Sequence, residues 1–190
     1  PVADIRIDGA GKKVTRSDNC RVSDLSVSSD NLTFTYEAKS LPYPIDTSYY
    51  DNEKHTQADA LSVIPFMDEM NYEGLSVSGL SDGYYGLTIG REFIGRFTAR
   101  ELERGINMAL LQNTPQYKQA MKIRQMNEER WLKERKMREF YWVEYNLMRK
   151  TGMLWACNEA AVDTLRKYRP HDIFLQWNGD LWLQYMHKGI

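Results

Sequence analysis

The sequence predicts an α+β protein: an antiparallel β-sheet or sandwich-like part over about residues 1–97, followed by helices that include one long helix over about 115–150. Two observations support this prediction. In the first part apolar side chains alternate with polar ones, which is typical of strands with one buried face. In the second part no glycine or proline interrupts the long stretch after Pro115, so one helix can continue through it. We therefore expect a β-rich domain in residues 1–113 and a helical extension in residues 114–190.

The clearest strands are near the start of the chain. Ile5 and Ile7 alternate with charged residues, and Leu32, Phe34 and Tyr36 alternate with threonines and a glutamate. Because successive side chains of a strand point to opposite faces, each run places its apolar residues on one face. Both runs are expected to cover the core of a sheet.

A second β section follows at residues 75–97, where regularly spaced glycines favour hairpins with tight turns. Between the two β sections, residues 56–66 are compatible with a short helix that a proline ends. After the second section, Thr98 and Glu101 have the spacing of a capping box. They predict a helix from about Ala99 to Leu111.

The long helix begins at Thr114-Pro115, because a capping residue followed by proline at the first helical position is a strong start signal. Its middle is densely charged, with few apolar residues. A helix that is polar in its middle projects into solvent or rests on a partner surface. We predict that its exposed apolar residues form such an interface: Trp131, Leu132, Met137 and Tyr141.

The net charge of −1 conceals an asymmetry along the chain. Residues 1–113 carry a net charge of −6, residues 114–150 carry +5, and residues 151–190 are balanced. A basic segment can bind nucleic acid, and the residues for it would be Lys118, Lys122, Arg124, Lys133, Arg135 and Lys136. A solvated helix face explains these charges better, so we expect no nucleic-acid partner.

Cysteines and hydropathy limit the classes of protein further. Cys20 and Cys157 are too few for a disulfide framework or a zinc cage. They could pair once in an oxidising compartment, or both could be free thiols. No run of about 18 apolar residues is present, so we expect no membrane span. No secretory leader is visible at Pro1, and we expect any such leader to lie outside this sequence.

The residues do not compose a catalytic centre. A serine or cysteine nucleophile needs a sharp turn and a histidine within hydrogen-bond reach, but there is no Gly-Asp-Ser, and Ser81-Asp82-Gly83 predicts a hairpin turn. Asp51 and His55 could share a helix face, although a polar surface segment explains them better. No set of His, Cys, Asp or Glu residues has the spacing of metal ligands. We therefore expect no catalytic residue, no cofactor and no metal.

Aromatic residues near the C-terminus raise one alternative. Trp177 and Trp182 could stack on a sugar ring, which would make the chain a free-standing carbohydrate-binding or protein-interaction module. Most aromatic side chains in a domain of this size belong to the core or to interfaces. Carbohydrate binding is therefore the second hypothesis.

A series of phrases in residues 2–150 resembles the region that follows the catalytic domain in bacterial SGNH/GDSL-like hydrolases, a lipase/acylhydrolase-like family. Each phrase is short, and their order and spacing together carry the resemblance. The phrases are Val2-Ala3-Asp4-Ile5, Asn19-Cys20-Arg21-Val22, Leu32-Thr33-Phe34, Leu41-Pro42-Tyr43-Pro44-Ile45, Leu75-Ser76-Val77-Ser78-Gly79-Leu80, Tyr85-Gly86-Leu87-Thr88-Ile89-Gly90, Ile94-Gly95-Arg96-Phe97, Glu101-Leu102-Glu103-Arg104-Gly105-Ile106-Asn107-Met108-Ala109, Thr114-Pro115-Gln116-Tyr117 and Glu129-Arg130-Trp131.

The resemblance implies a non-catalytic accessory role. In that family the catalytic serine lies in a Gly-Asp-Ser motif and an Asp-x-x-His motif closes the catalytic domain; no position here matches either. It therefore implies that an SGNH-type catalytic domain, in cis or in trans, is the partner of this region. It also implies a bacterial periplasmic or extracellular location and a role in supporting or gating an esterase that acts on acylated carbohydrate or lipid-like substrates.

Overall fold

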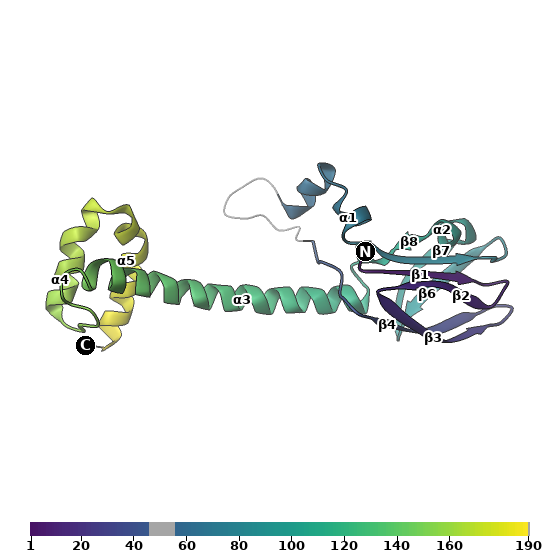
Figure 1. Ribbon diagram of the computed structural model, residues 1–190, viewed down its shortest axis with the longest axis horizontal. Helices are drawn as coiled ribbons and strands as arrows, with labels where there is room; N and C mark the ends of the chain where they lie inside the picture. Colours follow the sequence, from purple (N-terminus) through teal and green to yellow (C-terminus); the bar gives the residue numbers. More distant parts are fainter. Residues whose placement is uncertain (46–55, 190) are drawn as a thin grey trace. The chain divides into compact units, whose positions relative to one another are not determined.

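The computed structural model describes residues 1–45 and 56–189 (Figure 1). Side chains are described as far as Met186. The contacts divide the chain into two compact units, Pro1–Arg124 and Gln125–Ile190, and each is described by itself. Strands dominate the first unit and helices form the second, so the predicted α+β class is confirmed.

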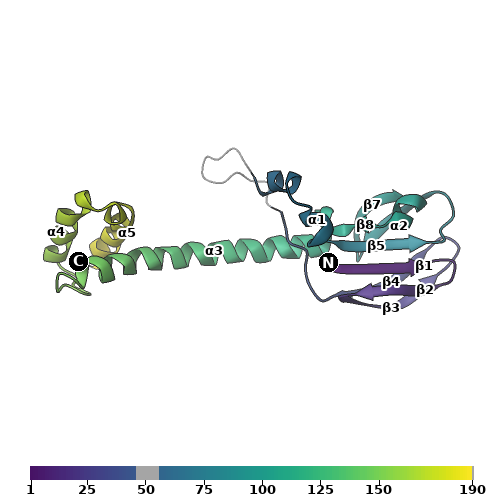
Figure 2. The same ribbon diagram turned by 45° about the horizontal axis from the view of Figure 1, so that its top comes forward.

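Unit 1 contains one four-stranded sheet and two separate hairpins (Figure 2). The strand order of the sheet is β2-β1-β5-β8, and the hairpins are β3–β4 and β6–β7. Strands β1 and β5 are parallel, whereas we expected antiparallel pairing throughout. The bounds are β1 Ala3–Asp8, β2 Lys13–Asp18, β3 Cys20–Val27, β4 Leu32–Ala38, β5 Glu73–Ser78, β6 Tyr84–Ile89, β7 Glu92–Thr98 and β8 Ile106–Asn107.

The predicted alternation produces the core of unit 1. Ile5 and Ile7 of β1 are buried, and Leu75 and Val77 of β5 lie beside them in register. The apolar side chains of β4 and β6 cover this cluster but remain only partly buried. The two hairpins therefore close over the sheet incompletely.

Short helices complete unit 1: η1 Gln57–Ser62, α1 Phe66–Glu69, α2 Ala99–Arg104 and η2 Met108–Leu110. Thr98 and Glu101 form the expected capping box. The expected continuation of α2 to Leu111 is wrong. Gly105 has φ +93, a conformation that glycine adopts readily, and it ends the helix so that residues 106–107 pair with β5.

The long helix α3 spans Pro115–Val143 and starts at the predicted residue, where the Thr114 hydroxyl accepts a hydrogen bond from the Tyr117 amide. It continues as one π-helical turn, η3 Glu144–Met148. Unit 2 also contains α4 Glu159–Tyr168, η4 Arg169–His171 and α5 Ile173–Gly189. Its core is assembled around side chains from α3, η3, α4 and α5: Val143, Leu147, Met148, Ala161, Val162, Leu165, Leu175, Trp182 and Met186.

Candidate functional site

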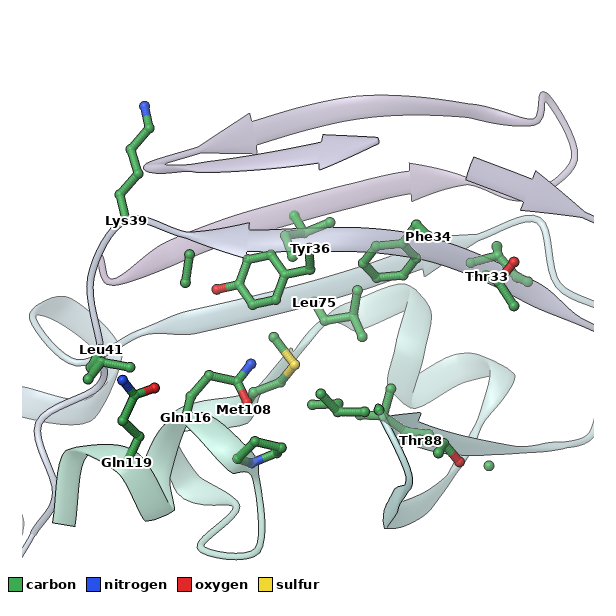
Figure 3. Close-up of a pocket in the computed structure, with 18 of the residues that line it drawn as sticks. Thr33, Phe34, Tyr36, Lys39, Leu41, Leu75, Thr88, Met108, Gln116 and Gln119 are labelled. Carbon is green, nitrogen blue, oxygen red and sulfur yellow. The ribbon is translucent and has the colours of Figure 1, made fainter. Parts of the chain in front are cut away.

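A large hollow of unit 1 lies between the two hairpins (Figure 3). It is a cavity of about 1090 Å³, bordered by β4 on one side and β6 on the other. Its wall includes Ile5 and Leu75 from the sheet, and Gln116 from the first turn of α3. The cavity therefore combines apolar walls with a polar end, as ligand pockets do.

Behind that polar end lies Glu73, whose side chain is fully buried. It occupies the same face of β5 as Leu75 and Val77. Glu73 Oε1 accepts hydrogen bonds from the Tyr36 hydroxyl at 2.8 Å and from Gln116 Nε2 at 3.4 Å. Glu73 Oε2 and Gln116 Oε1 are both buried and lack a hydrogen-bond partner.

Burial dominates the electrostatics of this pair. It raises the pKa of Glu73, and the hydrogen bonds from Tyr36 and Gln116 oppose that effect only in part. Burial also raises the pKa of Tyr36, and the adjacent Glu73 carboxylate adds to the rise. The Tyr36 hydroxyl therefore stays protonated and acts as a hydrogen-bond donor. The charged form of Glu73 is disfavoured because the carboxyl group is buried away from water.

The four residues predicted as an interface on α3 are all exposed by 42–57%. At about 100° per residue they do not share one face of the helix. Met137 and Tyr141 lie together, whereas Trp131 and Leu132 point in two other directions. A partner would therefore have to contact more than one side of α3.

Tyr141 belongs to an exposed aromatic cluster with Tyr145 and Trp155. The ring centroids of Trp155 lie 5.7 Å from those of both tyrosines, in edge-to-face geometry. Trp155 has φ +62, which is unusual for a residue with a side chain. Its amide donates a 2.9 Å hydrogen bond to the buried Glu144 carboxylate, which fixes this conformation.

Trp177 and Trp182 do not form one exposed platform. Trp177 is 65% exposed and packs edge-to-face on Phe174, which contacts Trp142. Trp182 is fully buried, and its indole donates a 2.7 Å hydrogen bond to Glu144 Oε1. Any stacking of a sugar on this unit would have to use Trp177 without Trp182.

One catalytic motif was overlooked in the sequence. Residues 79–83 read Gly-Leu-Ser-Asp-Gly and have the Gly-x-Ser-x-Gly spacing of a nucleophile elbow. Here the motif connects strands β5 and β6 rather than a strand and a helix, and Ser81 is exposed. The described part of unit 1 contains no histidine that could serve as its base. The expected hairpin turn is wrong as well, because β5 and β6 do not pair and residues 79–83 connect two different sheets.

The other predicted groups are dispersed. Asp51 and His55 lie outside the described residues. Cys20 is buried and Cys157 exposed, and neither is in a disulfide. Within residues 1–45 and 56–189, no cluster of potential metal ligands occurs. No helix in that part of the chain is long and apolar enough to cross a membrane.

A comparison with protein families finds a match to the helical part. Residues 121–190 match the family described as the diltiazem deacetylase C-terminal helical domain. The match covers about a third of the chain, and this part of the chain is similar to that domain. The matched residues include the aromatic cluster, Glu144 and Trp182. No match was found among curated proteins.

A solved structure extends the likeness to both units. The chain is 35% identical to BT4096, described as a gut microbial diltiazem-metabolizing enzyme, with a TM-score of 0.85. The match covers 97% of this chain but only 42% of the other. The β-rich unit is therefore shared with that enzyme along with the helical domain, and more than half of the enzyme has no counterpart here.

Proposed function

We propose that this chain is the non-catalytic accessory region of a deacetylase of the SGNH/GDSL esterase type, and that it supports or gates a separate catalytic domain. One observation carries the proposal: nearly the whole chain resembles a drug-metabolizing enzyme, yet it spans 42% of that enzyme. Because the name of the helical domain refers to a deacetylase, the reaction of the whole protein is taken to be removal of an acetyl group.

The side chains are consistent with an accessory role for this chain and catalysis by a separate domain. Ser81 lies on a turn between strands, and no described histidine occurs in its unit. The order of phrases from Val2 to Trp131 resembles the region that follows an SGNH catalytic domain. The chemistry is accordingly assigned to the catalytic domain, with a periplasmic or extracellular location as in that family.

Exposed apolar side chains provide the docking surface for this domain. Trp131, Leu132 and Met137 are half-exposed among charged neighbours, and the Tyr141–Tyr145–Trp155 cluster adds aromatic surface beside Arg149, which stacks on Tyr145. Tryptophan, tyrosine and arginine are the residue types that contribute most binding energy at interfaces. We expect the catalytic domain to cover part of this surface.

An ester-hydrolysis assay tests the proposal. The 190-residue chain should not hydrolyse p-nitrophenyl acetate above the rate of a denatured sample, whereas a protein that joins it to the catalytic domain should. Ser81→Ala should leave the activity of that longer protein unchanged, as should the control Ser29→Ala in another exposed turn. Turnover by the chain alone that Ser81→Ala abolishes would refute the accessory role.

A second candidate function is binding of carbohydrate through Trp177. The exposed Trp177 ring continues a row of contacts through Phe174 to Trp142, with centroids 5.5 Å apart at each step. Such a row can stack on sugar rings. Binding of an oligosaccharide by the isolated chain, lost in Trp177→Ala, would favour this function.

A further inference from the structure

We infer that the cavity between β4 and β6 is a binding site for a small amphipathic primary amine, whose ammonium group is received by Glu73 and Gln116. The site lies entirely within unit 1, so the inference is independent of the proposed accessory role.

The cavity can hold the apolar part of such a ligand. Its volume of about 1090 Å³ slightly exceeds the usual range for small-molecule pockets, about 300–1,000 Å³. Figure 3 shows Phe34, Leu75 and Met108 along its walls. A flat apolar body would add contacts to Phe34, which is only partly buried, and would rest against the buried Leu75 and Met108.

The polar end of the cavity has two buried acceptor atoms that receive no hydrogen bond. The one hydroxyl proton of Tyr36 is already donated to Glu73 Oε1. Glu73 Oε2 and Gln116 Oε1 are acceptors that receive no hydrogen bond. A buried acceptor left unsatisfied is costly, so a ligand group that brings two donors would be favoured here.

The charge of Glu73 indicates which kind of donor group the site would bind. Glu73 is fully buried, and no described residue forms an ion pair with it. Lys39 lines the cavity, but in Figure 3 its side chain extends away from Tyr36 and Gln116. An ammonium group offers three donors and a positive charge, whereas a hydroxyl offers one donor and no charge. A cation beside the buried carboxylate would offset the free-energy cost of removing that carboxylate from water.

Access to the carboxylate depends on Gln116. The Gln116 side chain lines the cavity and contacts Glu73 through a hydrogen bond of 3.4 Å, which is near the limit for such a bond. Rotation of this amide would expose Glu73 Oε2 and turn Gln116 Oε1 toward the same ligand nitrogen. The rings of Tyr36 and Phe34 on the adjoining wall would add cation–π attraction.

Tryptamine and tryptophol form a matched pair of probes, because they share an indole and differ in an ammonium or a hydroxyl head. Calorimetric titration of the folded chain at pH 7 should show tryptamine binding at least about tenfold more tightly than tryptophol, since hydrogen bonds to charged groups are the stronger ones. Glu73→Gln should abolish this preference. The control Glu37→Gln, an exposed residue on β4 that pairs with Arg21, should retain it.

Two further variants separate the head group from the apolar wall. Phe34→Ala should weaken the binding of both probes to a similar degree, because it removes part of the apolar wall and no charge. Gln116→Leu should weaken the binding of tryptamine alone. If Glu73→Gln fails to fold by circular dichroism, the Gln116→Leu result decides. Equal affinity for the two probes, no binding of either, or an unchanged preference in Glu73→Gln or Gln116→Leu would overturn the inference.

Discussion

Among the described residues, each unit has one completely buried glutamate, and the hydrogen bonds of the two carboxyl groups differ. In unit 2, Glu144 receives one hydrogen bond on each oxygen, from the Trp182 indole at 2.7 Å and from the Trp155 amide at 2.9 Å. In unit 1, Glu73 receives both of its hydrogen bonds on Oε1, and Oε2 receives none. Both carboxyl groups are fully shielded from solvent.

This difference indicates that the Glu144 carboxylate is structural, whereas the Glu73 carboxylate is available to bind a ligand. Satisfied buried polar groups hold a core in one arrangement, whereas a partly satisfied group is costly to the fold. Glu144 ties the π-helical turn, the left-handed Trp155 and α5 into one cluster. Glu73 lies beside a cavity with part of its hydrogen-bonding capacity unused. The comparison therefore assigns stability to Glu144 and ligand recognition to Glu73.

The largest expected effect is on the core that Glu144 organises. Trp182→Ala should lower the free energy of unfolding of unit 2 by about 4 kcal/mol, because it leaves a large cavity and an unpaired carboxylate oxygen. All five tryptophans lie in unit 2, so urea unfolding followed by tryptophan fluorescence reports on this unit. A loss below about 1 kcal/mol would mean that Trp182 is not packed as described.

The next prediction concerns the carboxylate itself. Glu144→Leu should destabilise unit 2 by about 3 kcal/mol, because the Trp182 indole and the Trp155 amide are both left without an acceptor. Glu139→Gln, five residues earlier on α3, removes only the charge of a partly exposed pair with Arg135 and should cost under about 0.5 kcal/mol. Similar effects of the two substitutions would remove the distinction between a structural and a surface glutamate.

These two glutamates also show which features of the structure could be predicted from the sequence. Alternation predicted β1 and β4, and the Thr114-Pro115 signal placed the start of α3 at its observed residue. Glu73 was missed, although it precedes Leu75 and Val77 in the same alternating pattern and so marks a carboxylate on an inward face. Its partners Tyr36 and Gln116 are 37 and 43 residues away, and only the tertiary fold brings them together.

Other failures have equally local causes. The sequence predicted that α2 continues past Gly105. In the structure this glycine ends the helix, and the residues that follow it pair with β5. Trp177 and Trp182 both looked available for stacking, but only one of them faces solvent. They are five residues apart, so on a helix they point in different directions.

A smaller effect, of opposite sign, is expected at Glu73. Glu73→Gln should stabilise unit 1 by about 1 kcal/mol at pH 7, because it removes a desolvated charge and keeps the shape. The raised pKa means that the folded chain binds this proton more tightly than the unfolded chain. The wild-type free energy of unfolding should therefore fall as pH rises from the ordinary value of 4.5 toward the folded-state pKa, and then level off.

Circular dichroism in the β region, measured from pH 4 to pH 8, checks this prediction. The difference between Glu73→Gln and wild type should grow with pH over that interval, while the unfolding midpoint followed by tryptophan fluorescence should not change. A pH-independent difference would show that the charge of Glu73 is not the cause. Destabilisation at every pH would show that Glu73 supports the fold as Glu144 does.

The smallest effect on stability is expected at Trp177, the exposed neighbour of the core tryptophan. Trp177→Ala should change the free energy of unfolding by less than about 0.5 kcal/mol, because surface substitutions away from special features rarely do more. An interface or sugar-binding ring can be energetically silent in the free protein and still dominate binding. If Trp177→Ala proves as damaging as Trp182→Ala, the ring is part of the core, and neither carbohydrate nor a partner domain can be assigned to it. If stability is unchanged while binding of an oligosaccharide or of the catalytic domain is lost, the contrast between the two tryptophans is one between recognition and packing within a single helix.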